Sequence, residues 1–301
     1  MKWLFFFLLP ALSATKVTVQ GYFSKGKVKT TADLIKFNGF LFMFSAIALT
    51  IIACFSIKNI PSGQTIIFAL VLSLLAISFQ CFYVLSFKTG AVSLSTTVAN
   101  FGIVLPIVFS TLFYNDKLTL FKIIGFVLIA CTFILIPSSD KKTNSLKVNK
   151  RQLKTSKKWF IFIILATLST GSASIFQNIS AKTPVRNEVE VLTALTYIFA
   201  TIFSFILLPI VKSKTSQPLY KSDIKVNIGL FIMGITLGLY NMFAIIAQSF
   251  IPATEFFPTT SGLNILFAVI TTAITFKEIP SFKQFLAIIL TIVAVVIINL
   301  S

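Results

Sequence analysis

Residues 80–136 decide the fold of this chain: QCFYVLSFKTGAVSLSTTVANFGIVLPIVFSTLFYNDKLTLFKIIGFVLIACTFILI, from Gln80 to Ile136. The stretch predicts the end of one apolar helix, a tight turn at residues 88–90, a second helix, a charged break at residues 115–117 and a third apolar helix. The same plan returns near the C-terminus. Closely spaced apolar helices of this length are typical of membrane-spanning chains.

An internal duplication explains the second occurrence. Residue 91 falls on residue 253 when the numbering is shifted by about 162, and the shift aligns further pairs without a gap, namely Thr97 with Thr259, Asp116 with Glu278, Thr119 with Ser281, and Ile136 with Ile298. A second, shorter similarity relates residues 11–13 to residues 167–169. We therefore predict a first repeat over residues 1–137, a basic connecting loop over 138–158, and a second repeat over 159–301.

Composition places the chain in the membrane. Of its 301 residues, 56% are hydrophobic and only 11% are charged, and the mean hydropathy is +0.94, values far from those of soluble domains. The net charge of +18 comes from lysines that lie between the apolar runs. That placement indicates loops retained on one side of a membrane. We expect the lipid bilayer as a partner and no nucleic acid.

Cysteine and histidine usage argues against several kinds of site. The three cysteines, Cys54, Cys81 and Cys131, lie inside apolar runs, and their spacing matches neither a disulfide framework nor a zinc site. The chain has no histidine, the commonest metal ligand and the commonest acid or base near neutral pH. We predict no catalytic residues, no metal and no cofactor.

The apolar runs predict ten transmembrane helices. The first covers about residues 3–23; its basic start and small residues also resemble a signal peptide, but its length and its internal similarity favour a retained helix. The others cover about residues 35–57, 64–87, 91–114, 118–137, 159–181, 189–211, 226–250, 253–276 and 282–300.

Five helices in each half require the two copies to cross the bilayer in opposite senses. The predicted fold is therefore an all-α polytopic membrane protein, with ten transmembrane helices arranged as two inverted five-helix repeats. Such proteins enclose a site near the middle of the membrane and transport by alternating access. Lysines and arginines are more frequent after helices 1, 3, 5, 7 and 9, which predicts that both termini lie outside.

The run from Tyr83 to Ile136 resembles the EamA-type domain of the drug/metabolite transporter superfamily. The resemblance rests on the short-turn helix pair, a mid-helix proline, an acidic residue before a threonine, and a glycine six residues after that threonine, at Pro106, Asp116, Thr119 and Gly125. Residues 253–299, with Lys277 and Glu278, look like a second copy. The resemblance implies a carrier of small organic molecules with a cavity lined by helices 1, 3, 4, 6, 8 and 9.

Two features differ from the family pattern. Better-known members are usually drawn with cytoplasmic termini, so the orientation stays open. Small multidrug-resistance relatives exchange protons through a carboxylate in the first helix, and no Asp or Glu lies between Trp3 and Phe23. The resemblance therefore does not extend to that mechanism.

Polar side chains within the helices are the candidate substrate-binding residues, because they are costly in hydrocarbon and usually face the bundle interior. In the first helix Lys16 is the leading candidate, with Gln20 on the same stripe; Lys16 either meets an anionic or zwitterionic substrate, with Glu255 as an alternative partner, or lies at the wet end of a tilted helix. The other candidates are Gln80, Tyr83, Thr97, Asn100, Asn241, Gln248, Glu255, Thr259 and Asn264. Hydroxyl groups among them could instead permit close helix packing.

The function predicted from these features is a secondary transporter for a small organic metabolite or drug-like molecule in a plasma membrane, bacterial in origin. A membrane channel or scaffold subunit is the alternative. An intramembrane enzyme is disfavoured because the chain has no GxSxG, no HExxH and no GxxxxGK[ST] motif. A monomer could hold the whole site, and a homodimer is compatible with the sequence.

Overall fold

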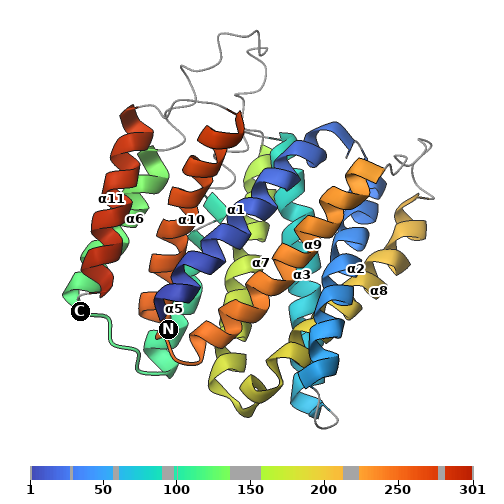
Figure 1. Ribbon diagram of the computed structural model, residues 1–301, viewed down its shortest axis with the longest axis horizontal. Helices are drawn as coiled ribbons and strands as arrows, with labels where there is room; N and C mark the ends of the chain where they lie inside the picture. The colour runs from blue at the N-terminus through green and yellow to red at the C-terminus, as the bar shows by residue number, and fades with distance from the viewer. Residues whose placement is uncertain are drawn as a thin grey trace. The chain divides into compact units, whose positions relative to one another are not determined.

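The computed structural model describes residues 2–27, 30–56, 61–89, 98–99, 101–135, 157–212, 224–276 and 282–299. Within these ranges the chain forms α-helices and two short 3-10 helices (Figure 1). In chain order they are α1 (Lys2–Lys27), α2 (Thr31–Ser56), α3 (Gly63–Thr89), η1 (Phe101–Ile103), α5 (Val104–Phe113), α6 (Leu120–Leu135), α7 (Lys157–Lys182), η4 (Pro184–Glu188), α8 (Val189–Lys212), α9 (Ile224–Gln248), α10 (Ala253–Phe276) and α11 (Phe282–Asn299). The predicted all-helical fold class is confirmed for this part of the chain.

The predicted helix bounds agree with these helices to within several residues. The predicted helix over 91–114 is described only in part, as η1 and α5, because residues 90–97 and 100 lie outside the described ranges. The charged break after it is present: residues 114–119 are non-helical, and Asn115 has a positive φ of 53°. Asparagine tolerates this left-handed conformation better than most residues, so the break predicted from the sequence has a local cause.

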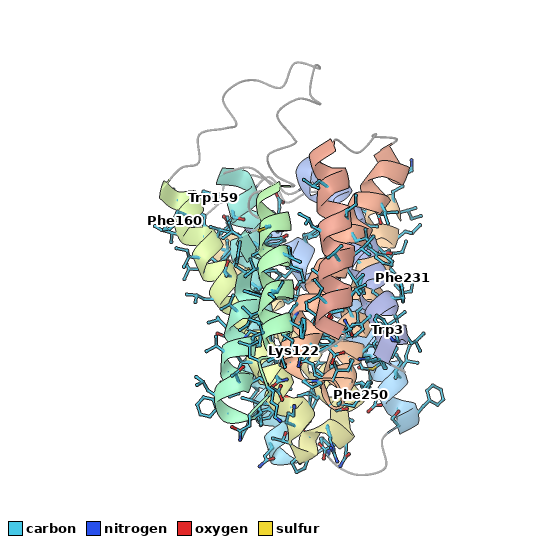
Figure 2. The ribbon with its side chains drawn as sticks, turned by 90° about the vertical axis from the view of Figure 1, so that its left-hand side faces the viewer. Trp3, Lys122, Trp159, Phe160, Phe231 and Phe250 are labelled. Atoms are coloured by element: carbon cyan, nitrogen blue, oxygen red, sulfur yellow. The ribbon has the colours of Figure 1, made fainter. Side chains whose placement is uncertain are left out.

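Five helices in the described part of the chain are long and apolar enough to cross a membrane. They cover Thr31–Ser56, Gly63–Ser86, Lys158–Lys182, Pro184–Lys212 and Ile224–Gln248. Shorter apolar helices lie at Phe101–Phe113 and Leu120–Cys131. Large aromatic side chains on helix surfaces fit the same environment: Phe160 and Phe231, exposed by 60% and 47%, project outward (Figure 2). The chain is therefore a membrane protein with multiple apolar helices.

The described residues divide into two compact units. Unit 1 comprises residues 1–11, 82–175 and 251–301, and unit 2 comprises residues 12–81 and 176–250. Each unit thus combines segments from both halves of the sequence. The repeat boundaries predicted at 137 and 159 concern sequence copies and stay a prediction.

In unit 2, helix α2 packs on α8 and α9. The rings of Phe42 and Tyr197 lie 6.0 Å apart and those of Phe40 and Phe205 lie 5.5 Å apart, so α8 runs antiparallel to α2. Helix α9 approaches α2 most closely at Gly234, where a Cβ atom would lie 2.9 Å from the backbone oxygen of Leu41. Only glycine permits this backbone contact.

In unit 1, helices α6 and α11 lie side by side (Figure 1). Ile129 of α6 packs in a fully buried cluster with Ala294 and Ile298 of α11. A Cβ at Gly125 would lie 3.0 Å from the Ala294 backbone oxygen, and it would also meet Ile298, so the two helices pack closely at this glycine. They run antiparallel, because α6 begins at the end of the pair where α11 reaches the C-terminus (Figure 1). Helix α10 contacts α5, α6 and α11.

Polar side chains fix the start of helices in unit 2. Thr30 and Asp33 form a reciprocal capping box at α2: the Thr30 hydroxyl accepts from the Asp33 amide and the Asp33 carboxylate accepts from the Thr30 amide, both at 3.0 Å. At α3, the Ser62 hydroxyl accepts from the Thr65 amide at 3.3 Å. The carboxylate of Glu188 adds a long-range cap there, accepting from the Ser62 amide at 2.9 Å and from the Thr65 hydroxyl at 2.6 Å.

Candidate functional site

A directed hydrogen-bond network joins three helices inside unit 2. The Gln177 side-chain amide on α7 donates to the Asn241 side-chain oxygen on α9 at 2.7 Å. The Asn241 side-chain amide in turn donates to the Tyr197 hydroxyl on α8 at 2.6 Å, and to its own helix at the Leu237 backbone oxygen at 2.9 Å. Asn241 is therefore the centre of the network, and all of its side-chain atoms have partners.

A second amide pair lies two turns further along α9. The Asn178 side-chain amide donates to the Gln248 side-chain oxygen at 3.4 Å, and the Gln248 amide donates to the Ala244 backbone oxygen at 3.1 Å. Asn178 and Gln248 are fully buried. The side-chain oxygen of Asn178 has no hydrogen-bond partner within the described part of the chain.

These groups suit the recognition of a polar ligand. A buried polar atom without a partner costs free energy, and polar side chains at membrane depth are a functional-site hypothesis by default. Tyr197 is only 3% exposed, and its hydroxyl accepts a bond while its own proton has no acceptor among the described residues. Unit 2 thus holds a spare donor at Tyr197 and a spare acceptor at Asn178.

Lys16 brings a positive charge into unit 2. It lies in α1 and is partly buried. The described residues contain a single ion pair, Lys2 with Glu255, so Lys16 has no carboxylate partner among them. A lysine in a helix that the sequence predicts to cross the membrane, and without a protein counter-ion, is a candidate to bind an anionic group.

The predicted residues of helix α10 lie in unit 1. The Lys2 ammonium group of α1 donates to the Glu255 carboxylate at 2.8 Å, and the Glu255 side chain is 13% exposed. Thr259 is buried and accepts from the Asn299 side-chain amide of α11 at 3.3 Å. Asn264 is partly buried, and its side-chain oxygen has no partner in the described residues. Glu255 therefore has Lys2 as its partner here, and its predicted pairing with Lys16 stays a prediction.

The remaining predicted residues are placed less fully. Gln80 is buried and Tyr83 partly buried on α3. The side chain of Gln20, together with residues Thr97 and Asn100, lies outside the described part of the structure. Of the eleven predicted residues, the structure places Asn241 and Gln248 in buried hydrogen bonds with α7.

Three polar groups of these networks were not among the predicted site residues. Gln177 and Asn178 lie near the predicted end of their helix, where an interfacial role is at least as common as a role in a binding site. Tyr197 lies mid-helix in a run of apolar residues, where a tyrosine is usually interpreted as a buried core residue. The signal that could have found them is the seven-residue spacing of Asn241 and Gln248, which places both amides on one face of α9 and favours polar partners on a neighbouring helix.

Apolar helices of spanning length with buried, neutral polar networks define a polytopic membrane protein with a polar interior, the class that includes small-molecule transporters. The model of the EamA-like transporter family matches residues 1–137 and 150–300. The chain belongs to this family of transporters, within the drug/metabolite transporter superfamily.

Structural comparison agrees on the fold. A solved structure titled "Crystal structure of protein" matches with a TM-score of 0.76 and 13% sequence identity, over 99% of this chain and 96% of the other. At that identity the match shows a shared fold alone. No curated protein matches the chain.

Proposed function

We propose that the protein is a secondary transporter that moves a small organic metabolite or drug-like molecule across a bacterial plasma membrane by alternating access. The observation that carries the proposal is the Gln177–Asn241–Tyr197 network in unit 2 of a chain from a transporter family. Neutral amides and a phenol can exchange hydrogen bonds with a passing substrate and add no charge of their own to the membrane interior.

The inverted ten-helix repeat belongs to this proposal. Helix α2 and its counterpart α8 pack antiparallel in unit 2, and α6 and its counterpart α11 do so in unit 1 (Figure 1). Opposite directions for equivalent helices are what inverted repeats require. This supports two copies that cross the membrane in opposite senses.

The substrate carries an anionic group, and Lys16 is its counter-charge. Lys16 lies in α1, which we propose to cross the membrane, and it has no carboxylate partner in the described residues. A carboxylate or phosphate on the substrate would supply that partner. Gln20, Gln80, Tyr83, Thr97, Asn100, Glu255, Thr259 and Asn264 remain proposed substrate-binding residues.

The proposal is tested with the full-length protein in lipid vesicles. A thermal-shift screen of metabolites in detergent first identifies a ligand, because binding to the native state raises apparent stability. The radiolabelled hit should then show saturable uptake and counterflow. Linear flux would indicate a channel instead, and product formation would indicate an enzyme.

Variants at the centre of the network connect flux to the site. Asn241→Ala should lower saturable flux at least about tenfold, because it removes both bonds of the relay and leaves their partners unpaired. Asn187→Ala is the matched control, since Asn187 is an exposed asparagine of the same unit outside the network. Equal flux in the two variants would refute the assignment of this site.

A further inference from the structure

The first turn of α10 in unit 1 is held by side chains that come from far away in the sequence. The Asp116 carboxylate accepts from the Ala253 amide at 2.9 Å. The Lys122 ammonium group donates to the Thr254 hydroxyl at 3.3 Å and to the Lys117 backbone oxygen at 3.3 Å. Two of these bonds therefore join the α5–α6 junction to the start of α10, and the bond from Lys122 to Lys117 lies within the junction.

The sequence before α10 explains why a remote cap is needed. A helix usually receives its cap from a Ser, Thr, Asp or Asn directly before its first turn. Pro252 occupies that position and has no side-chain acceptor; its backbone oxygen accepts from the amides of Glu255 and Phe256. The Ala253 amide would remain unpaired without Asp116, whose negative charge also suits a helix N-terminus.

Lys122 adds a second constraint. Lys122 lies on α6 (Figure 2) and is only 7% exposed. In the described part of the chain its ammonium group bonds to two neutral oxygens, those of Lys117 and Thr254, and not to a carboxylate. Burying a charged group is unfavourable unless its donors are satisfied. The start of α10 supplies one of the two acceptors, so displacement of α10 would leave this charge undersolvated.

The same turn of α10 carries proposed substrate-binding residues. Glu255 follows Thr254 directly and bonds to Lys2 from α1, while Thr259 lies one turn further along and bonds to Asn299. Their positions depend on where α10 begins and on how it is rotated, both of which Asp116 and Lys122 restrain.

We propose that Asp116 and Lys122 are positioning residues for transport: they fix the first turn of α10 and thereby hold Glu255 and Thr259 where the substrate meets them. This inference rests on the proposed function for the role of Glu255 and Thr259. The restraint on α10 itself stands on the hydrogen bonds alone.

Hydrogen exchange of the full-length protein tests the restraint without a substrate. Asp116→Ala should speed exchange of the amides at 253–257 by about tenfold or more, because a lost cap lowers the free energy of local opening. Asp116→Asn keeps an oxygen acceptor and should give a smaller increase, and Asp116→Glu should restore protection in part. Unchanged exchange in Asp116→Ala would overturn the proposal.

A matched control exists in unit 2. Glu188 also caps a helix from a distance, at the start of α3. Glu188→Ala should speed exchange near residues 62–66 and leave residues 253–257 unchanged, and Asp116→Ala should do the reverse. A general loosening of both regions by either variant would refute a local restraint.

The transport role is tested with the metabolite that passes the flux test above. Asp116→Ala and Glu255→Gln should each raise the KM several-fold. The double variant should raise the KM by less than the product of the two single increases, because Asp116 acts by positioning Glu255. Asp116→Ala and Glu188→Ala should combine independently. Altered exchange with unchanged KM and Vmax would overturn the transport role. If no metabolite is carried, the proposed function fails and hydrogen exchange alone decides the restraint.

Discussion

The two units differ in the polar side chains that join their helices to one another. Unit 2 holds a neutral network of amides and a phenol, centred on Asn241 and reaching Tyr197. Unit 1 holds charges, and they gather at the start of α10, where Asp116, Lys122 and Glu255 each have a partner. Neutral groups can release and regain partners at low cost, whereas buried charges hold their partners firmly. We therefore expect the neutral network of unit 2 to act mainly in substrate recognition, and Asp116 and Lys122 of unit 1 to act mainly as restraints on α10.

Breaking the helix contact that supports unit 2 should have the largest effect. Gly234→Leu places a side chain where even a Cβ lies 2.9 Å from the Leu41 backbone oxygen. Overpacking of this kind costs about 1–3 kcal/mol or more, so the thermal midpoint in detergent should fall by several degrees. Gly63→Leu is the control, because nothing lies within 4 Å of its Cβ position. A Gly234→Leu midpoint equal to that of the control would contradict the close packing.

The second-largest effect should come from removing the positive charge of Lys16 in unit 2. Lys16→Ala should reduce Vmax/KM for an anionic substrate about tenfold or more, equivalent to roughly 1.4 kcal/mol, while Lys16→Arg keeps the charge and should retain more activity. Lys158→Ala, at an exposed lysine near the start of α7, controls for net charge. Vesicle flux measures all three variants. Equal flux of Lys16→Ala and the wild type at matched expression would remove Lys16 from the site.

A finer change within the network should have a smaller effect. Tyr197→Phe removes the acceptor of the Asn241 amide and the spare hydroxyl donor, and a single hydrogen bond is worth about 1 kcal/mol. We expect ligand affinity to fall by roughly fivefold, as measured by thermal-shift titration. In the Asn241→Ala background the same change should cause little further loss. Full additivity of the two changes would show that the groups act separately.

The smallest effect should come from the exposed ion pair of unit 1. Lys2 is 39% exposed, and pairs of this kind contribute about 1 kcal/mol or less. Lys2→Met should lower the thermal midpoint slightly at low salt and not at all at high salt, where the wild-type pair is screened. A fall in the thermal midpoint as large as that of Gly234→Leu would show that the Lys2–Glu255 ion pair stabilises unit 1 by much more than about 1 kcal/mol.

The sequence predicted the helices well because their signal is local. Long apolar runs and the breaks between them set where helices lie, and the helix over 253–276 matches α10 residue for residue. Asn241 and Gln248, seven residues apart on α9, both bond to side chains of α7, namely Gln177 and Asn178. Helical periodicity gave the spacing that puts both on one stripe.

The hydrogen-bond and ion-pair partners of polar side chains were harder to predict than the helix faces on which those side chains lie. Glu255 was considered as a partner for Lys16, yet its ion pair in this structure is with Lys2. Asp116 was recognised only as part of a family pattern, and its bond to the Ala253 amide spans 137 residues of sequence. The counterpart of Asp116 in the second copy, Glu278, and the counterpart of Ala253 in the first copy, Ala91, both lie outside the described residues.

The sequence by itself determined that this protein is an α-helical membrane protein with polar stripes on particular helices, because hydrocarbon demands long apolar segments that satisfy their own backbone. Tertiary structure alone decided which polar side chains contact each other. Gln177 bonds to Asn241, 64 residues away in the sequence, and Asp116 caps helix α10, whose preceding proline has no side-chain acceptor. Periodicity fixes the direction in which a side chain points along its own helix, whereas the neighbour it finds depends on how distant segments pack.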